Sequence, residues 1–249
     1  MTRVMLTVAY DGTNYHGWQL QPNAITVEGV LNEALSELLH EDIKVIGASR
    51  TDTGVHALGN IAVFDTEARI PAEKVSYALN QRLPDDIRIQ KSQQVSLDFH
   101  PRHQNSKKTY EYRILNREFA LPTQRLYSHF TYVPLDVDLM KAGAKYLIGE
   151  HDFKSFCSVN TVVESTVRTI YDISVTKHED IISIKVTGSG FLYNMVRIIA
   201  GTLMEIGKGK TEPQKVKDML EALDRTASGP TAPACGLTLM SYEYVDGVY

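Results

Sequence analysis

One acidic side chain in this sequence stands among residues that could make it reactive. Asp52 lies in the segment Gly47–Ala57, close to Arg50, to two hydroxyl side chains and to a glycine that allows unusual backbone angles. A charged carboxylate held in this way could act as a nucleophile or as a base. A tight turn in which Asp52 bonds its own backbone would explain the same residues, and the residue types alone favour that simpler interpretation.

A second candidate is Arg197, the only charged residue among the fourteen from Phe191 to Met204. The rest of that segment is apolar or weakly polar and predicts a helix. An arginine there either extends its guanidinium to water, which is the commoner outcome, or is buried beside an acid. The small neighbours Ala200 and Gly201 indicate that another segment packs closely against this helix.

Positive charge is concentrated in one part of a chain whose net charge is −4. The overall balance gives no support for nucleic-acid binding, so any contact with RNA must rest on a local patch. Between residues 100 and 125, six basic residues outnumber two acidic ones, with aromatic side chains interleaved. The basic residues are Arg102, Lys107, Lys108, Arg113, Arg117 and Arg125. A solvated strand face would give the same pattern.

No motif in the sequence predicts a metal site, a redox site or a membrane segment. Cys157 and Cys235 lie far apart in no metal-binding spacing, which indicates reduced thiols in a cytosolic protein. The histidines at 56, 100, 103 and 151 match no zinc pattern. The longest apolar stretch is too short to cross a bilayer, and residues 1–12 do not resemble a secretory signal. We therefore expect a cytoplasmic protein that uses no metal and no cofactor.

The elements that must position these residues follow a repeated order. In the first half, the patterns predict strands at 3–10, 43–48, 58–64 and 87–89, and helices at 27–39 and 71–83. In the second half, they predict strands at 109–115, 126–132, 169–176, 181–187 and 237–245, and helices at 137–148, 191–206 and 212–223. Each half has the order βαββαβ of a ferredoxin-like unit, the second with one extra strand and one extra helix.

We therefore predict an α+β fold of two ferredoxin-like units side by side, with mainly antiparallel sheets and a catalytic cleft between them. The N-terminal α+β domain would cover residues 1–102 and carry the loop with Asp52. The C-terminal α+β domain would cover residues 103–249. Such a fold hosts many functions, so the function must be argued from the residues of the site.

Five stretches of the sequence, in the right order, resemble those of the tRNA pseudouridine synthase A family. The segment Arg50–Ala57 resembles the family's signature loop, in which the aspartate is catalytic. The other stretches are Tyr10–Gln19, Asp98–Tyr112, Gly188–Arg197 and Ala232–Leu237. Ser49 and Thr53 replace the Gly and Ala frequently found beside that aspartate, and we expect no loss of activity from two residues this small. The resemblance covers nearly the whole chain.

The resemblance implies a function and a set of site residues. It implies an isomerase that converts uridine to pseudouridine at positions 38, 39 and 40 in the anticodon stem-loop of tRNAs, with Asp52 as the catalytic residue and no metal. It makes Arg197 the guanidinium partner of that carboxylate and places Tyr110 against the uracil. It further implies that Leu237 forms an apolar wall of the uracil pocket. Arg50, two residues before Asp52, is expected from its position to hold the flipped nucleotide or a phosphate.

Other parts of the prediction concern partners and the route of the reaction. Arg102, Lys107 and Lys108 are expected to contact the RNA backbone. The resemblance implies a homodimer with tRNA laid across both subunits. Whether the carboxylate attacks C1′, attacks C6 or removes the 2′ proton to give a glycal stays open.

Two other classes of function would use parts of the same sequence. Asp11 and Asp52, each after a strand, could form a two-metal site, although a guanidinium at Arg50 suits a cation site poorly. A non-catalytic RNA-binding module would need exposed aromatics on a central strand, which residues 60–64 and 181–184 do not supply.

Overall fold

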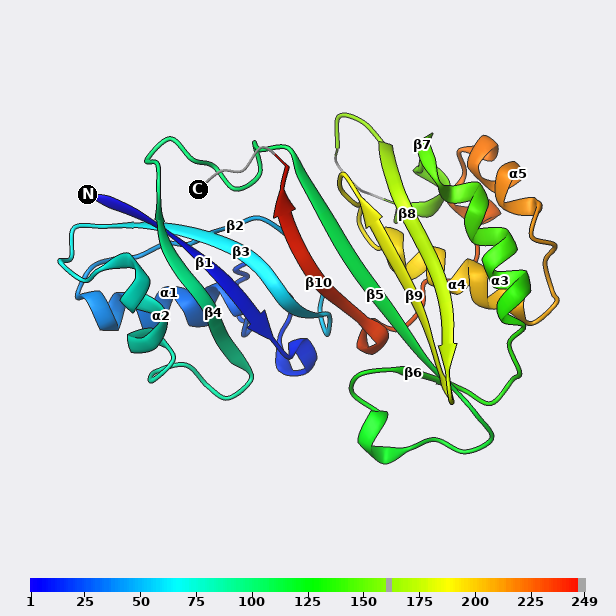
Figure 1. The fold of residues 1–249 in the computed structure, drawn as a ribbon, viewed down its shortest axis with the longest axis horizontal. Helices are drawn as coiled ribbons and strands as arrows, with labels where there is room; N and C mark the ends of the chain where they lie inside the picture. The colour runs from blue at the N-terminus through cyan, green and yellow to red at the C-terminus, as the bar shows by residue number, and fades with distance from the viewer. Residues whose placement is uncertain (160–162, 246–249) are drawn as a thin grey trace. The chain divides into compact units, whose positions relative to one another are not determined.

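The computed structural model describes residues 1–159 and 163–245, and this part of the chain divides into two compact units (Figure 1). The first unit holds Met1–Ser106 and the described residues from Leu239 onward, and the second holds Lys107–Thr238. The last strand therefore lies largely with the first unit, whereas the division predicted from the sequence, between residues 102 and 103, placed it in the second.

The first unit is built on the predicted βαββαβ order. Its elements are β1 (Thr2–Tyr10), α1 (Val27–Leu39), β2 (Ile46–Gly47), β3 (His56–Thr66), α2 (Ala72–Leu79) and β4 (Ile87–Val95). In the sheet, β1 lies between β4 and β3 and is antiparallel to both. On its other side, β3 pairs with the short β2 and with β10 (Leu237–Tyr244). The interleaved order of β1, β3 and β4 is that of a ferredoxin-like unit.

Local sequence signals explain where α1 begins and ends. The side chain of Thr26 accepts a hydrogen bond from Gly29 N–H at 3.2 Å, which caps the first turn. His40 closes the helix in the left-handed conformation, with φ of 58°. Between these ends, Leu31 and Leu35 are fully buried on one stripe, as the apolar spacing predicts.

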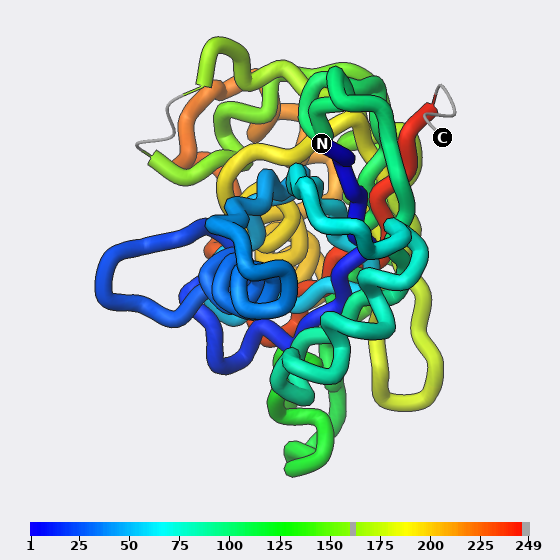
Figure 2. Tube along the Cα trace, turned by 90° about the vertical axis from the view of Figure 1, so that its left-hand side faces the viewer, coloured from blue at the N-terminus to red at the C-terminus, as the bar shows by residue number. Residues whose placement is uncertain are grey.

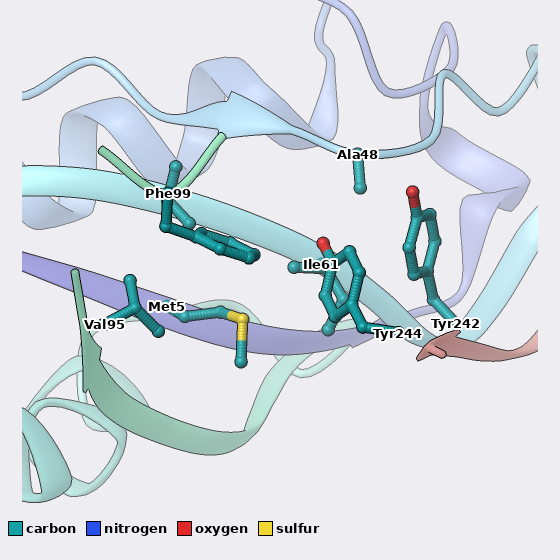
Figure 3. Close-up of a cluster of buried hydrophobic side chains, with 8 residues drawn as sticks. Met5, Ala48, Ile61, Val95, Phe99, Tyr242 and Tyr244 are labelled. Atoms are coloured by element: carbon teal, nitrogen blue, oxygen red, sulfur yellow. The ribbon is translucent and has the colours of Figure 1, made fainter. Parts of the chain in front are cut away.

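A buried cluster on one face of the first unit's sheet fixes the segment that leads to Arg102 (Figure 3). The cluster consists of Met5, Ala48, Ile61, Val63, Val95, Phe99, Tyr242 and Tyr244. The ring of Phe99 meets that of Tyr244 edge-on at 5.3 Å. The hydroxyls of Tyr242 and Tyr244 donate to the Pro101 carbonyl at 3.0 and 3.1 Å. β10 thereby anchors the chain directly before Arg102.

The second unit carries an antiparallel sheet in the order β5-β9-β8-β7. Its elements are β5 (Ser106–Asn116), β6 (His129–Thr131), α3 (Val137–Ala144), β7 (Gly149–Asp152), β8 (Val167–His178), β9 (Ile181–Gly188), α4 (Met195–Gly207) and α5 (Lys215–Ala222). Every residue of α4 except Arg197 and Glu205 is buried. α3 packs on α4, where a Cβ at Gly143 would lie 2.7 Å from the Ile206 side chain.

The α+β class with mainly antiparallel strands is confirmed. Several element predictions need correction. Only residues 46–47 of the strand predicted at 43–48 form a strand, which pairs with β3. The strand β7 was missed because Gly-Glu-His-Asp shows no apolar alternation. The helix predicted from Phe191 begins at Met195, because Asn194 adopts a left-handed conformation with φ of 61°. Among the described residues, no helix combines the length and apolar character needed to cross a bilayer.

Candidate active site

The segment around Asp52 is held first by hydrogen bonds to the adjoining strand. Ala48 N–H donates to the Ile61 carbonyl of β3 at 2.7 Å. One step further, the fully buried amide of Asn60 accepts from Ser49 N–H at 3.2 Å and donates to the Ser49 carbonyl at 3.0 Å. An asparagine side chain can thus supply both of the partners that a neighbouring strand would give. Asn60 thereby replaces strand pairing at Ser49 and shapes the start of the loop.

A second set of contacts comes from the polar loop that follows β1, residues 11–26 (dark blue in Figure 2). Trp18 N–H donates to the Thr51 carbonyl at 3.0 Å, and Gly54 N–H donates to the Tyr15 carbonyl at 3.3 Å. These two bonds lie on either side of Asp52 in the sequence. The backbone at Asp52 is therefore fixed by residues that are remote along the chain.

Two glycines let the loop after β1 approach the Asp52 loop more closely than a side chain would allow. A Cβ at Gly12 would lie 2.0 Å from the carbonyl oxygen of Val55. Gly17, with φ of +84°, would place a Cβ 2.6 Å from the carbonyl oxygen of Thr51. Both contacts are with backbone atoms, which cannot move aside without moving Asp52. The two sequence stretches therefore form one structural unit.

Asp52 is half-buried on this clamped loop. Its carbonyl accepts a hydrogen bond from Val55 N–H at 3.1 Å, and Gly54 takes a φ of +77° within the turn. The tight turn expected from the residue types is therefore present, and the backbone carbonyl of Asp52 forms it. A partly exposed carboxylate on a fixed backbone is the arrangement that a nucleophile or a base requires.

Two guanidinium groups lie near the same loop in the first unit. Arg50 is exposed, and Arg102 donates from Nε to the Gly47 carbonyl at 2.8 Å. Burial against the loop lowers the pKa of Arg102, and the positive charge of Arg50 lowers it further. Two guanidinium groups close enough to repel each other attract an anion, and arginine forks match phosphate geometry.

The carboxylate of Asp11, which the two-metal alternative invokes, has a structural role. Its Oδ1 accepts from Thr13 N–H at 3.0 Å and thereby caps the short 3₁₀ helix Gly12–Asn14. The same oxygen lies 3.1 Å from Nδ1 of His56. Within residues 1–159 and 163–245, no group of three or more His, Cys, Asp and Glu side chains could together hold a metal ion.

In the second unit, Tyr110 and Tyr112 share one face of β5 but differ in their contacts. Tyr110 is 8% exposed and meets the Phe191 ring edge-on at 5.2 Å. Tyr112 is fully buried, and its hydroxyl donates to the Pro233 carbonyl at 2.9 Å. Burial raises the pKa of Tyr112 well above its ordinary value. The phenol of Tyr112 therefore has a structural hydrogen bond that the sequence does not reveal.

Arg197 lies in the first turn of α4, where the helix dipole disfavours a positive charge. Its Nε donates to the Ala232 carbonyl at 2.7 Å, and its Nη1 donates to Oδ1 of Asn194 at 2.7 Å. The Arg197 carbonyl in turn accepts from Ala232 N–H at 3.1 Å. The Arg197 side chain is thus held by hydrogen bonds to Ala232 and Asn194, unlike an arginine that merely extends to water.

The segment from Gly229 to Leu237 is pressed against α4 and β5. A Cβ at Gly201 would lie 1.8 Å from the Pro230 carbonyl oxygen, which confirms the close packing predicted from the small residues of this helix. A Cβ at Gly236 would lie 2.7 Å from the ring of Tyr112. Leu237 follows and is buried.

The two lysines predicted to contact RNA begin β5. Lys107 is exposed, and its Nζ lies 5.5 Å from the centre of the Tyr171 ring. Lys108 is half-buried. An exposed ammonium over an aromatic ring keeps a face open to a phosphate.

The predicted site residues are divided between the two units. Arg50, Asp52 and Arg102 belong to the first, and Lys107, Lys108, Tyr110, Arg197 and Leu237 belong to the second. Within the second unit, the segment 229–237 brings Arg197 and Tyr112 into one network. The assignment of all eight predicted residues to one site stays a prediction.

Comparison with known proteins identifies the family. A family model described as tRNA pseudouridine synthase matches residues 6–104 and 144–245. A protein of Thermoanaerobacter sp. (strain X514) named tRNA pseudouridine synthase A is 50% identical over 244 residues, which cover 98% of this chain and 100% of that protein. The chain belongs to the tRNA pseudouridine synthase family.

Further relatives in this family match over the same extent. Proteins named tRNA pseudouridine synthase A from Ruminiclostridium cellulolyticum and Brevibacillus brevis are 49% and 47% identical over 98% of this chain and all of their own length. Among solved structures, an archaeal box H/ACA Nop10-Cbf5 complex aligns with 95% of this chain and 45% of that chain, at 10% identity and a TM-score of 0.34. The family assignment rests on the sequence relatives.

Sequence reasoning missed polar residues that shape the loops of this family member. Asn60 orders the start of the Asp52 loop. Asn194 bonds to the Arg197 guanidinium, and Ser158 bonds in turn to the Asn194 amide. Asn60 directly precedes an apolar strand run, and Asn194 directly precedes an apolar helix. An amide beside such a run is the signal that could have drawn attention to them, because a buried amide needs specific partners.

Proposed function

We propose that this protein isomerises uridine to pseudouridine at positions 38, 39 and 40 in the anticodon stem-loop of tRNAs, with Asp52 as the essential carboxylate. The observation that carries the proposal is an identity of about half of all residues with proteins named tRNA pseudouridine synthase A, along the full length of those proteins. The clamped turn that holds Asp52 supports it.

The chemistry asks little of the protein beyond a positioned carboxylate. The N1–C1′ glycosidic bond breaks, the uracil turns, and a bond from C5 to C1′ forms. C5 loses a proton and N1 gains one, so the atoms balance without an oxidant or a reductant. The charged carboxylate could attack C1′, attack C6 or remove the 2′ proton, and each route needs Asp52 in its ionised form.

The remaining site residues take roles that match their side chains. Tyr110 would stack on the uracil, and its phenol could take up the C5 proton. Arg197 would act on the reacting carboxylate, and Leu237 would supply an apolar wall. Arg50 would hold the flipped nucleotide, which must leave the base stack to expose C1′.

The RNA backbone would be held by local positive charge on an acidic protein. Arg102, Lys107 and Lys108 are the proposed phosphate contacts. The resemblance of the sequence to the family also supports a homodimer that acts in the cytoplasm.

The direct test uses unmodified tRNA transcripts with uridine at positions 38, 39 or 40. After incubation with the protein, pseudouridine is mapped chemically at single-nucleotide resolution. We expect signal at these positions and none in matched transcripts that carry cytidine there. Pseudouridine elsewhere would change the proposed substrate, and its absence from every transcript would contradict the proposed function.

A further inference from the structure

The residue that precedes α4 does not cap the helix in the usual way. Asn194 adopts the left-handed conformation, with φ of 61° and ψ of 7°, which few residues other than glycine adopt. An asparagine in this position ordinarily accepts hydrogen bonds from the free amides of the first turn. Within the described chain, the side chain of Asn194 caps none of them. Its Oδ1 accepts instead from Nη1 of Arg197 at 2.7 Å.

The other end of the Asn194 amide, away from Arg197, is also held by a hydrogen bond. Its Nδ2 donates to Oγ of Ser158 at 2.8 Å. The N–H of Ser158 donates to the Tyr193 carbonyl at 3.1 Å, which ties Ser158 to the residue before Asn194. Because a guanidinium can only donate, the amide presents its oxygen to Arg197, and its Nδ2 is left to donate to the Ser158 hydroxyl, which anchors the amide.

Two sides of the Arg197 guanidinium are therefore held. Nη1 meets Asn194, and Nε meets the Ala232 carbonyl at 2.7 Å. A guanidinium is planar and rigid, so two fixed donors define its plane. The helix dipole works against a positive charge in this turn, so α4 itself gives Arg197 no favourable electrostatic anchor.

We propose that Asn194 is a positioning residue: its amide, anchored by Ser158, fixes the plane of the Arg197 guanidinium. The inference rests on the proposed function, because the proposed role of Arg197 is what makes its orientation matter for catalysis. The left-handed backbone at Asn194 is the local cost of placing this amide beside Arg197.

The variant Asn194→Gly tests the proposal cleanly, because glycine keeps the left-handed backbone and removes only the amide. We expect the single-turnover rate of pseudouridine formation to fall between about tenfold and a hundredfold, since a small misplacement of an active group has that effect. Affinity for tRNA should stay near that of the parent protein. A rate equal to that of the parent would overturn the proposal.

Asn80→Ala is the matched control. Asn80 is also half-buried at the end of a helix, and its side chain makes two hydrogen bonds to the Ile89 backbone, at 2.8 and 2.9 Å. It is expected to lower the melting temperature without a change in the single-turnover rate. An equal fall in rate for both variants would mean that lost stability explains the effect, and would overturn the positioning role.

A double-mutant cycle with Arg197→Lys tests whether Asn194 acts through Arg197. A lysine ammonium has no plane to be held, so Asn194→Gly should have little further effect on the rate in that background. Independent, multiplicative effects of the two substitutions would contradict the proposal.

A spectroscopic measurement separates this inference from the proposed function. If the parent protein makes no pseudouridine, the function fails, yet the geometry can still be tested by ¹⁵N NMR of the Arg197 side chain. We expect slow rotation of the guanidinium in the parent and faster rotation in Asn194→Gly. The same rotation rate in both proteins would overturn the positioning role, whatever the activity.

Discussion

Asp52 lies on a fixed loop and Arg197 lies in the first turn of α4, and the two are held by different kinds of contact. Around Asp52, backbone groups of Trp18 and Tyr15 bond to the residues on either side of it. Around Arg197, the side chain itself is held, by the Asn194 amide and the Ala232 carbonyl. One arrangement depends on backbone shape, and the other depends on the identity of neighbouring side chains.

This difference predicts how each region responds to substitution. The Asp52 loop should tolerate a change of the Asp52 side chain, because backbone hydrogen bonds on either side of this residue set the shape of the loop. The same loop should not tolerate an added Cβ where backbone meets backbone, as at Gly12. Arg197, whose own side chain is held by hydrogen bonds, should instead be sensitive to the removal of a single polar partner.

The largest expected effect is that of Asp52→Asn on activity. Turnover should fall below detection, a loss of at least about 4 kcal/mol in transition-state stabilisation, because an amide is a poor nucleophile and a poor base. The free energy of unfolding should change little. Asp42→Asn is the control, since that carboxylate is 85% exposed. Quantitative mapping of pseudouridine and urea unfolding measure the two quantities, and an appreciable rate for Asp52→Asn would show that the catalytic assignment is wrong.

The next effect is that of Gly12→Ala on stability. The new Cβ would lie 2.0 Å from the Val55 carbonyl oxygen, so the loops must separate, at a cost of about 3 kcal/mol. Gly209→Ala is the control: Gly209 has φ of +72° and nothing within 4 Å of the added Cβ, so only backbone strain of about 1 kcal/mol is expected. Urea unfolding compares them, and equal losses would mean that the contact between the two loops relaxes easily.

The two tyrosines of β5 provide a comparison within one strand. Tyr110→Phe should lower turnover by about a hundredfold, the typical contribution of a general acid or base, and leave tRNA binding near normal. Tyr112→Phe should instead lower the free energy of unfolding by about 1–2 kcal/mol, because it leaves the Pro233 carbonyl without its donor. Single-turnover kinetics and thermal unfolding of both variants would show it. The same profile for both would remove the distinction.

The parts of the fold that follow from local patterns could be predicted from the sequence. The apolar stripe and the Thr26 cap determine α1, and both are local signals. The place of β10 could not be predicted in this way, because its pairing with β3 is decided by residues far away in the sequence. The same reason hides the start of α4, since the left-handed Asn194 is stabilised by tertiary hydrogen bonds.

The sequence proposes candidate site residues where a motif itself contains them. Asp52 and Arg197 stand out as charges in characteristic surroundings, and the resemblance of the sequence supplies their roles. The sequence gives no partner for the hydroxyl of Tyr112 or for the amide of Asn60, because tertiary pairing brings them to the carbonyls of Pro233 and Ser49. A sequence pattern therefore finds reactive groups more readily than the polar side chains that orient them.

The smallest expected effect is a pH dependence of the free energy of unfolding, which arises in the segment that β10 anchors. In this segment positively charged side chains lie close to one another. The rings of His100 and His103 stack with centroids 3.9 Å apart. Burial lowers the pKa of His100, and the positive charges of His103, Arg102 and Arg3 lower it further. Arg102 N–H also donates to Nδ1 of His100 at 3.2 Å, which favours the neutral ring.

Because the folded protein then binds a proton at His100 less readily than the unfolded chain, the stabilisation from the neutral ring is fully present above about pH 6.5. It falls as the pH drops below that value. His100→Gln removes the titrating group, so its free energy of unfolding should fall less than that of the parent between about pH 7.5 and pH 5, by under about 1 kcal/mol because the ring is partly exposed. The exposed His178 provides the control variant, His178→Gln, which should follow the parent. Urea unfolding at both pH values decides the matter: identical pH dependence in all three proteins would show that the histidine pair does not contribute to stability in this way.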